Sequence, residues 1–139
     1  MKSWVAITLL WTGAIAFSQD LTSVTIQRIS TAKVFAFGGT GFAGTTSEGE
    51  RDFKIIMSLP SEEAIAAFER LYATGNAQAK GYALAGIRKL DKSMFDGLRT
   101  SVRASELNVQ TETGCIISER PLREVAVDLN SGKYDPWIR

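Results

Sequence analysis

The sequence between residues 47 and 104 contains successive apolar stripes with the spacing of an amphipathic α-helix, each preceded by a residue that commonly caps a helix. Side chains three and four positions apart lie on one face of a helix, so each stripe needs a partner surface. Only short turns separate the stripes, which keeps neighbouring helices in contact. The pattern therefore predicts a core made mainly of short helices.

The start of this region fits a capping box, in which Ser47 and Glu50 precede a helix over about 48–57. Gly49 weakens the helix prediction, and residues 53–59 also suit a strand before Pro60 breaks the segment. Three more helices are expected, each opened by a capping side chain: Ser61, Asn76 and Asp91. A last helix is expected to start at Pro121. The predicted core residues are Phe53, Ile56, Ile65, Phe68, Leu71, Leu84, Ile87, Phe95, Leu98 and Leu122.

Four shorter segments have β-type composition. Residues 21–29 suggest a strand or an extended arm, and residues 32–37 suggest a second strand. Residues 107–111 and 115–118 flank a plausible hairpin turn at 112–114. At 139 residues, one domain is the natural count. The predicted fold is a single helix-dominated α+β domain over residues 19–139, with three to five short helices packed on a few short strands.

Glycines punctuate the third predicted helix at Gly81 and Gly86, where they are expected to let a neighbouring helix approach closely. The sequence AKGYALAGIRKLD over residues 79–91, within the segment 78–98, resembles the second helix and turn of a HEAT-type helical repeat. The resemblance implies a local helical-hairpin geometry. No second copy recurs at the period of about 40–47 residues that such repeats have.

A glycine-rich motif, GGTGFAG, follows the second β-type segment at residues 38–44. Gly39, Gly41 and Gly44 match G-x-G-x-x-G, and the segment resembles the start of a Rossmann domain, which would imply dinucleotide binding. However, residues 45–50 are polar, and no second strand ends in an acid at the expected spacing of about 20 residues. We therefore interpret the motif as a loop with positive φ angles and close packing around Phe42. Anion or peptide binding by its backbone amides is a further interpretation.

Residues 1–18 have the pattern of a signal peptide. Lys2 is followed by an uncharged, mostly apolar run at 4–17, which is shorter than the roughly 20 residues of a membrane span. Ala16 and Ser18 suit cleavage before Gln19, and cleavage after Ala16 is the competing position. An uncleaved N-terminal anchor or a buried helix is the alternative interpretation. We expect an exported, periplasmic or secreted protein with no membrane span after processing.

Composition excludes several chemistries. The chain has no His, which removes imidazole-activated nucleophiles, imidazole metal ligands and imidazole proton shuttles. Its single cysteine, Cys115, is expected to be a buried small hydrophobic residue, with an intermolecular disulfide as the alternative. The net charge of +1 falls to zero without Lys2, which gives no reason to expect nucleic acid as a partner. No metal and no cofactor are expected.

These exclusions favour a non-enzymatic exported module that binds another protein or an envelope component. The candidate binding residues lie in the glycine loop and the C-terminal tail: Gly39, Gly41, Phe42, Gly44 and Trp137. One alternative is a small hydrolase that uses two carboxylates, because acid pairs such as Glu62 and Glu63 occur along the chain. Another alternative is a nucleotide-binding domain that uses the 38–44 loop. The sequence does not indicate an oligomeric state.

The signal-peptide interpretation predicts that the exported protein begins at Gln19, because Ala16 and Ser18 place small side chains at the two positions that signal peptidases recognise. N-terminal sequencing of the protein recovered outside the cytoplasm checks this. A recovered protein that begins at Met1 would contradict it.

Overall fold

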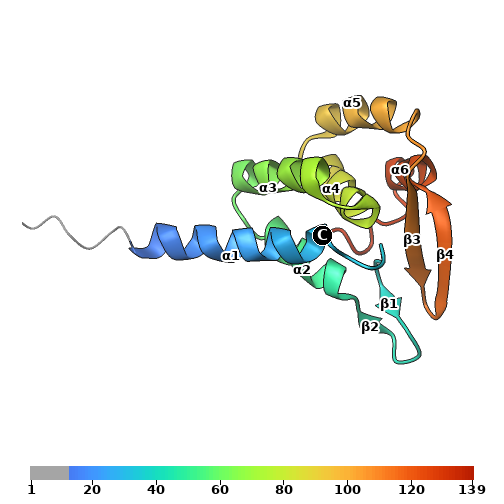
Figure 1. Ribbon diagram of the computed structural model, residues 1–139, viewed down its shortest axis with the longest axis horizontal. Helices are drawn as coiled ribbons and strands as arrows, with labels where there is room; N and C mark the ends of the chain where they lie inside the picture. The colour runs from blue at the N-terminus through green and yellow to red at the C-terminus, as the bar shows by residue number, and fades with distance from the viewer. Residues whose placement is uncertain (1–12) are drawn as a thin grey trace, which may run out of the picture.

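The computed structural model describes residues 13–139. In chain order its elements are α1 (Gly13–Ser30), β1 (Gly39–Thr40), β2 (Thr45–Thr46), α2 (Glu48–Met57), α3 (Ser61–Thr74), α4 (Ala77–Leu90), α5 (Lys92–Val102), β3 (Asn108–Thr113), β4 (Ile116–Pro121) and α6 (Leu122–Asn130). Figure 1 shows the helices gathered on one side of the molecule and the two hairpins projecting from the other. The predicted helix-dominated α+β domain is confirmed.

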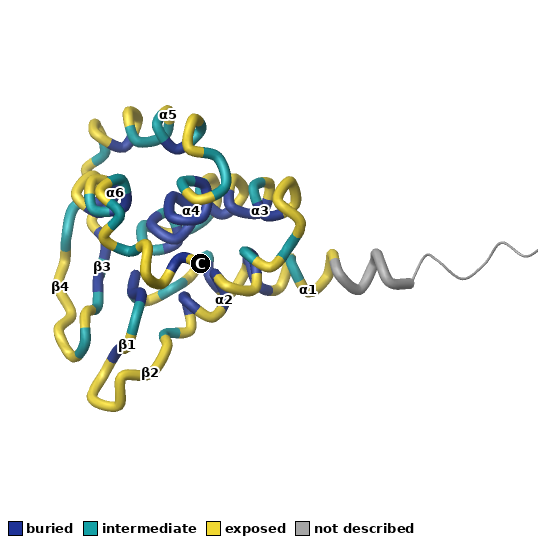
Figure 2. Tube along the Cα trace, turned by 180° about the vertical axis from the view of Figure 1, so that it is seen from behind, coloured by how far each residue is buried: buried dark blue, intermediate teal, exposed yellow. Residues whose placement is uncertain are grey.

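Helix α4 forms the centre of the core. Residues 81–87 of this helix are all buried, and α3, α5, α6 and β3 pack around it. Figure 2 shows α4 as the most continuously buried element. Gly86 allows the ring of Phe68 on α3 to lie directly on the α4 backbone, which is the close helix approach expected there. Gly81 instead allows the ring of Phe35 to lie against the α4 backbone, and Phe35 belongs to an extended segment rather than to a helix.

A cluster of buried aromatic rings joins the helices to the extended segment before β1. The ring of Phe37 lies 5.4 Å from Phe35, 5.1 Å from Phe53 and 5.4 Å from Tyr82, measured between centroids. The ring of Tyr134, from the C-terminal tail, lies 5.3 Å from Phe35. Most of these pairs meet edge to face, the arrangement that aromatic quadrupoles prefer. The extended segment and the tail are thus anchored by the same cluster.

The strands form two antiparallel hairpins, β1–β2 and β3–β4. In the second hairpin Thr113 pairs with Ile116 and Asn108 pairs with Pro121. Parallel bridges from Phe35 to Thr111 and from Thr40 to Gly114 hold the hairpins side by side. Residues 32–37, predicted as a strand, are therefore extended but form only a single bridge.

The interpretation of residues 21–29 as a strand or extended arm is wrong, because they belong to α1. Thr25, Ile26 and Ile29 are buried, at the three- and four-residue spacing of a helix face. The β-branched composition that suggested a strand is overridden by packing of this face against α2 and α3. Helix α1 also crosses the predicted processing point after Ser18, and residues 1–12 of the predicted signal peptide lie outside the described residues.

Local signals placed most other elements correctly. Side-chain oxygens of Ser47, Asn76 and Asp91 accept hydrogen bonds from their helix N-termini, as predicted. The prediction for Ser61 is wrong, because it is the first helical residue and Pro60 occupies the cap position. Of the predicted core, eight residues are buried, and Ile65 and Leu98 are partly exposed.

Cys115 is exposed, so the expectation of a buried cysteine is also wrong. With Gly114 it forms the turn between β3 and β4, where a side chain has no core to enter. Among residues 13–139, no helix is long and apolar enough to cross a membrane.

Gly86 lies in the contact between α3 and α4 and Gly97 lies in open space, so replacing each by Ala should change stability in opposite directions. Gly86→Ala should destabilise the fold by about 1–3 kcal/mol, because the new Cβ would overlap the buried ring of Phe68. Gly97→Ala, on α5, is the matched control, because no atom lies within 4 Å of the position that its new Cβ would take. It should stabilise by about 0.5–1 kcal/mol through reduced backbone entropy. Urea unfolding of both variants checks the sign, and equal effects would contradict this packing.

Candidate functional site

The β1–β2 hairpin, which we call the glycine hairpin, starts after Gly38, and a buried carboxylate fixes this base. Glu50, 2% exposed, accepts a hydrogen bond from the Gly38 N–H (2.9 Å) and one from Lys54 Nζ (2.7 Å). Ser47 caps α2 by accepting from the Glu50 N–H (3.1 Å), and its hydroxyl donates to the Ala36 carbonyl (3.1 Å). The capping box is therefore only half formed, since its glutamate binds the hairpin rather than the cap residue.

A buried tyrosine holds the extended segment that leads into this hairpin. The Tyr82 hydroxyl accepts from the Ala36 N–H (3.0 Å) and donates toward the Ala36 carbonyl (3.0 Å). Its oxygen lies 3.3 Å from Ser47 Oγ, so α4 and the start of α2 meet at one point. Burial raises the pKa of Tyr82, which keeps the hydroxyl protonated and able to donate. This contact sets the direction in which the hairpin leaves the core.

The tips of the two hairpins are tied together. The Gly41 N–H donates to the Gly114 carbonyl (2.7 Å), and Gly41, Gly44 and Gly114 all have φ between +58° and +67°. Few non-glycine residues adopt such angles, so these glycines are needed for the two turns. Positive φ at the glycine loop was predicted and is confirmed.

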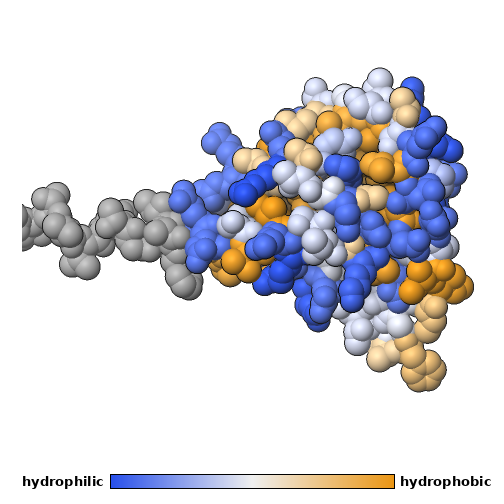
Figure 3. All heavy atoms as spheres, viewed as in Figure 1, coloured by the Kyte–Doolittle hydropathy of each residue, from blue (hydrophilic) through white to orange (hydrophobic). Residues whose placement is uncertain are grey.

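The side chains at these tips are exposed and apolar. Phe42 is 103% exposed and Ile116 is 71% exposed, so the expected packing around Phe42 is wrong. Figure 3 shows hydrophobic surface at the end of the molecule where the hairpins project. We call Phe42, Cys115 and Ile116 the apolar tip.

Trp137, the tail residue predicted to bind, lies at the base of the hairpin rather than at its tip. Its ring covers Gly38, where a Cβ would come within 3.0 Å of the indole and φ is +86°. Trp137 as a whole residue is 41% exposed, while the next residue, Ile138, is buried. Tyr134 and Ile138 pack on the core, so the tail docks on the body of the molecule. The structure thus brings Trp137 to the glycine hairpin but not to Phe42's end of it.

An ion-pair network fixes the start of this tail. Asp128, on α6, binds Arg120 Nη1 (2.6 Å) and Lys133 Nζ (2.9 Å). Burial works against ionisation of Asp128, but hydrogen bonds from Arg120 and Lys133 and their charges outweigh it and lower the pKa of the carboxyl. The network links β4, α6 and the tail that carries Trp137.

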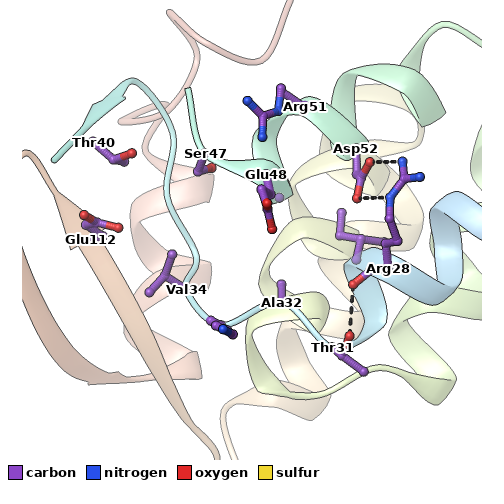
Figure 4. A pocket seen from close by; sticks show the side chains of 13 residues that line it. Arg28, Thr31, Ala32, Val34, Thr40, Ser47, Glu48, Arg51, Asp52 and Glu112 are labelled. Atoms are coloured by element: carbon purple, nitrogen blue, oxygen red, sulfur yellow. Dashed lines mark hydrogen bonds and ion pairs between the residues drawn. The ribbon is translucent and has the colours of Figure 1, made fainter. Parts of the chain in front are cut away.

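A cavity of about 610 Å³, lined by both charged and apolar residues, lies behind the hairpin base, between α1, α2 and β3. Figure 4 shows Arg28 reaching from α1 to Asp52 on α2, with Glu112 and Thr40 on the opposite side. Hydrogen bonding and charge from Asp52 raise the pKa of Arg28. The two acids buried among the described residues are both paired with a base, Asp52 with Arg28 and Glu50 with Lys54.

The glycine motif lacks the surroundings that dinucleotide binding requires. A Rossmann motif joins a strand of a parallel sheet to a helix. Here Gly39, Gly41 and Gly44 belong to an antiparallel hairpin, and residues 48–102 contain four helices and no strand. Among residues 13–139 there is also no group of three or more acidic, Cys or His side chains that could hold a metal ion.

Two features of the site escaped the sequence interpretation. Glu50 has the sequence position of a local cap, and its hydrogen bond to Gly38 depends on the folded chain path. Adjacent Ile116 and Ile117 suggest core residues, but neighbouring strand residues face opposite sides, so at least one had to point away from the body. That alternation was the available signal.

No protein-family model matches the chain, and neither the curated proteins nor the solved structures contain a match.

The tail network predicts acid-sensitive stability. Asp128→Asn should cost about 1–2 kcal/mol at neutral pH, because Asp128 loses charged hydrogen bonds with Arg120 and Lys133. Because folding lowers the pKa of Asp128, its ionised carboxylate stabilises the folded state at any pH above its pKa in the unfolded chain. This stabilisation is lost as the pH falls through its pKa in the folded state. The difference between wild type and variant should therefore shrink below about pH 4.

Urea titrations between neutral and acid pH measure this difference. Asp96→Asn removes an exposed partner of Lys92 and is the control, for which a much smaller change is expected. A pH-independent cost for Asp128→Asn would contradict the assignment.

Proposed function

We propose that this chain is a non-enzymatic exported protein that binds another protein or an envelope component through its apolar tip. The observation that carries the proposal is the full exposure of Phe42 on a glycine turn that is hydrogen-bonded to the turn beside Ile116. Export rests on the signal-peptide pattern of residues 1–18.

The tip has the properties of a binding anchor. Burying one large apolar side chain contributes about 1.5–3 kcal/mol, and aromatic anchors commonly dominate binding energy. The Gly41–Gly114 hydrogen bond and the Thr40–Gly114 bridge hold the two turns together before any partner arrives. A fixed surface loses less entropy on binding than a flexible loop does. Because the hairpins project (Figure 1), the partner should offer a concave apolar pocket.

The charges around the tip favour a protein over an anionic lipid surface. Residues 38–46 and 113–118 contain no charged side chain. Peripheral binding to anionic membranes combines apolar insertion with flanking Lys or Arg, and both segments lack them. An uncharged, rigid apolar projection instead suits a pocket in a folded partner.

The test is site-specific photo-crosslinking in the producing cells. A benzophenone amino acid at Phe42 should give one discrete crosslinked product, because it keeps an aromatic side chain at the tip. The same probe at Glu69, exposed on α3, is the control and should give none. Equal products at both positions, or no product at Phe42, would refute the proposal.

A second substitution tests the rest of the tip. Ile116→Ser should lower the yield of the Phe42 product roughly tenfold, since about 1.4 kcal/mol of apolar contact corresponds to a tenfold change in affinity. Ala66→Ser, at an exposed position of α3, should leave the yield unchanged. An unchanged yield with Ile116→Ser would exclude the second hairpin from the contact.

A further inference from the structure

The hydrogen bonds of β3 reveal which way the backbone of β4 faces. The Phe35 N–H donates to the Gln110 carbonyl (2.7 Å), and the Glu112 N–H donates to the Phe35 carbonyl (3.1 Å). Gln110 and Glu112 therefore direct their backbone groups away from β4. In an antiparallel pair such residues stand opposite residues that also point outward.

The register then identifies the open positions on β4. Gln110 stands opposite Glu119, and Glu112 stands opposite Ile117. Ile117 and Glu119 accordingly direct their N–H and C=O groups to the outer edge of the hairpin. Within the part of the chain that the structure describes, these N–H and C=O groups form no hydrogen bond. Figures 1 and 2 place β4 at the margin of the molecule, with no element beyond it.

Before Pro121, this edge has no Lys, no Pro and no bulge, and its charged residues are Glu119 and Arg120. Natural edge strands carry lysines, prolines or bulges that block another strand. Residues 116–120 contain no Lys and no Pro, and Ile117 is 60% exposed. Pro121 is the next residue after Ile117 and Glu119 whose backbone faces outward. It has no N–H, so the edge open to pairing ends there.

We infer that a second copy of this chain pairs with β4, antiparallel and centred on Ser118. The two outward residues lie symmetrically about Ser118, so this register sets Ile117 opposite Glu119 of the second copy and the reverse. All four outward backbone groups of each strand then form hydrogen bonds, and the two hairpins become one four-stranded sheet. An antiparallel strand pair of this kind is self-complementary, as a two-fold dimer requires.

The side chains permit this pairing. Glu119 faces an isoleucine rather than another acid, so no like charges stand directly opposite. Arg120 is occupied by Asp128 of its own chain. The shared edge is short, so the dimer should form and dissociate readily. Because the strands run in opposite directions, the two Phe42 side chains lie at opposite ends, and only Ile116 of each apolar tip stands opposite the second copy, at its Arg120. The inference rests on the backbone groups of β4 and does not depend on the proposed function.

Disulfide trapping tests the register. In a Cys115→Ser background, Ser118→Cys places the two thiols at a non-hydrogen-bonded pair with Cα atoms about 4.5 Å apart, within disulfide range. Ile116→Cys is the matched control, since its two copies are offset by four residues, about 13 Å. We expect covalent dimer from Ser118→Cys to form at least roughly tenfold faster under mild oxidation. Equal rates, or no dimer from Ser118→Cys, overturn the inference.

A second measurement separates pairing from folding. Glu119→Pro removes an outward N–H but no hydrogen bond of the β3–β4 ladder, a position that edge strands tolerate. It should keep the wild-type circular dichroism and remain monomeric in sedimentation equilibrium at concentrations where wild type associates. Phe42→Ser should associate like wild type, so loss of tip binding and loss of dimer are distinguishable. A wild-type chain that stays monomeric at millimolar concentration also overturns the inference.

Discussion

The Tyr82 hydroxyl is the contact on which the arrangement of this protein depends. It lies on the central helix α4, and it joins the backbone of Ala36 to the cap residue Ser47. Buried backbone N–H and C=O groups that do not belong to a sheet still need hydrogen-bond partners, and the Tyr82 hydroxyl is the partner of both groups of Ala36. The extended segment, the start of α2 and the helical core therefore have fixed relative positions.

That fixed base explains how a mostly helical domain presents two small hairpins. Glu50 holds the hairpin at Gly38, Trp137 covers the same glycine, and the bridge from Phe35 to Thr111 positions β3. Each support comes from a different part of the chain. The apolar tip and the open β4 edge are thus rigid surfaces built on a packed core, which suits binding better than mobile loops would.

The helices were predictable because their signals are local. Apolar spacing, capping residues such as Asn76 and Asp91, and Pro60 each act over one or two turns, so they indicate helix positions without reference to tertiary contacts. The candidate site was only partly predictable. The glycine loop and Trp137 were identified as binding candidates, but the exposure of Phe42 and Cys115 depends on where the core ends.

The sequence by itself determined the helix-dominated fold class, the need for positive φ angles in the glycine loop and the absence of imidazole chemistry. It also located the β3–β4 hairpin, although the predicted turn residues Glu112 and Thr113 belong to β3 and the turn lies at Gly114 and Cys115. Only the tertiary structure decided that residues 21–29 form a helix, since packing against α2 and α3 outweighs their β-branched composition. It also decided that Glu50 binds Gly38, that Ile116 points into solvent and that β4 keeps an open edge. These properties depend on contacts between residues far apart in the chain, which local patterns do not encode.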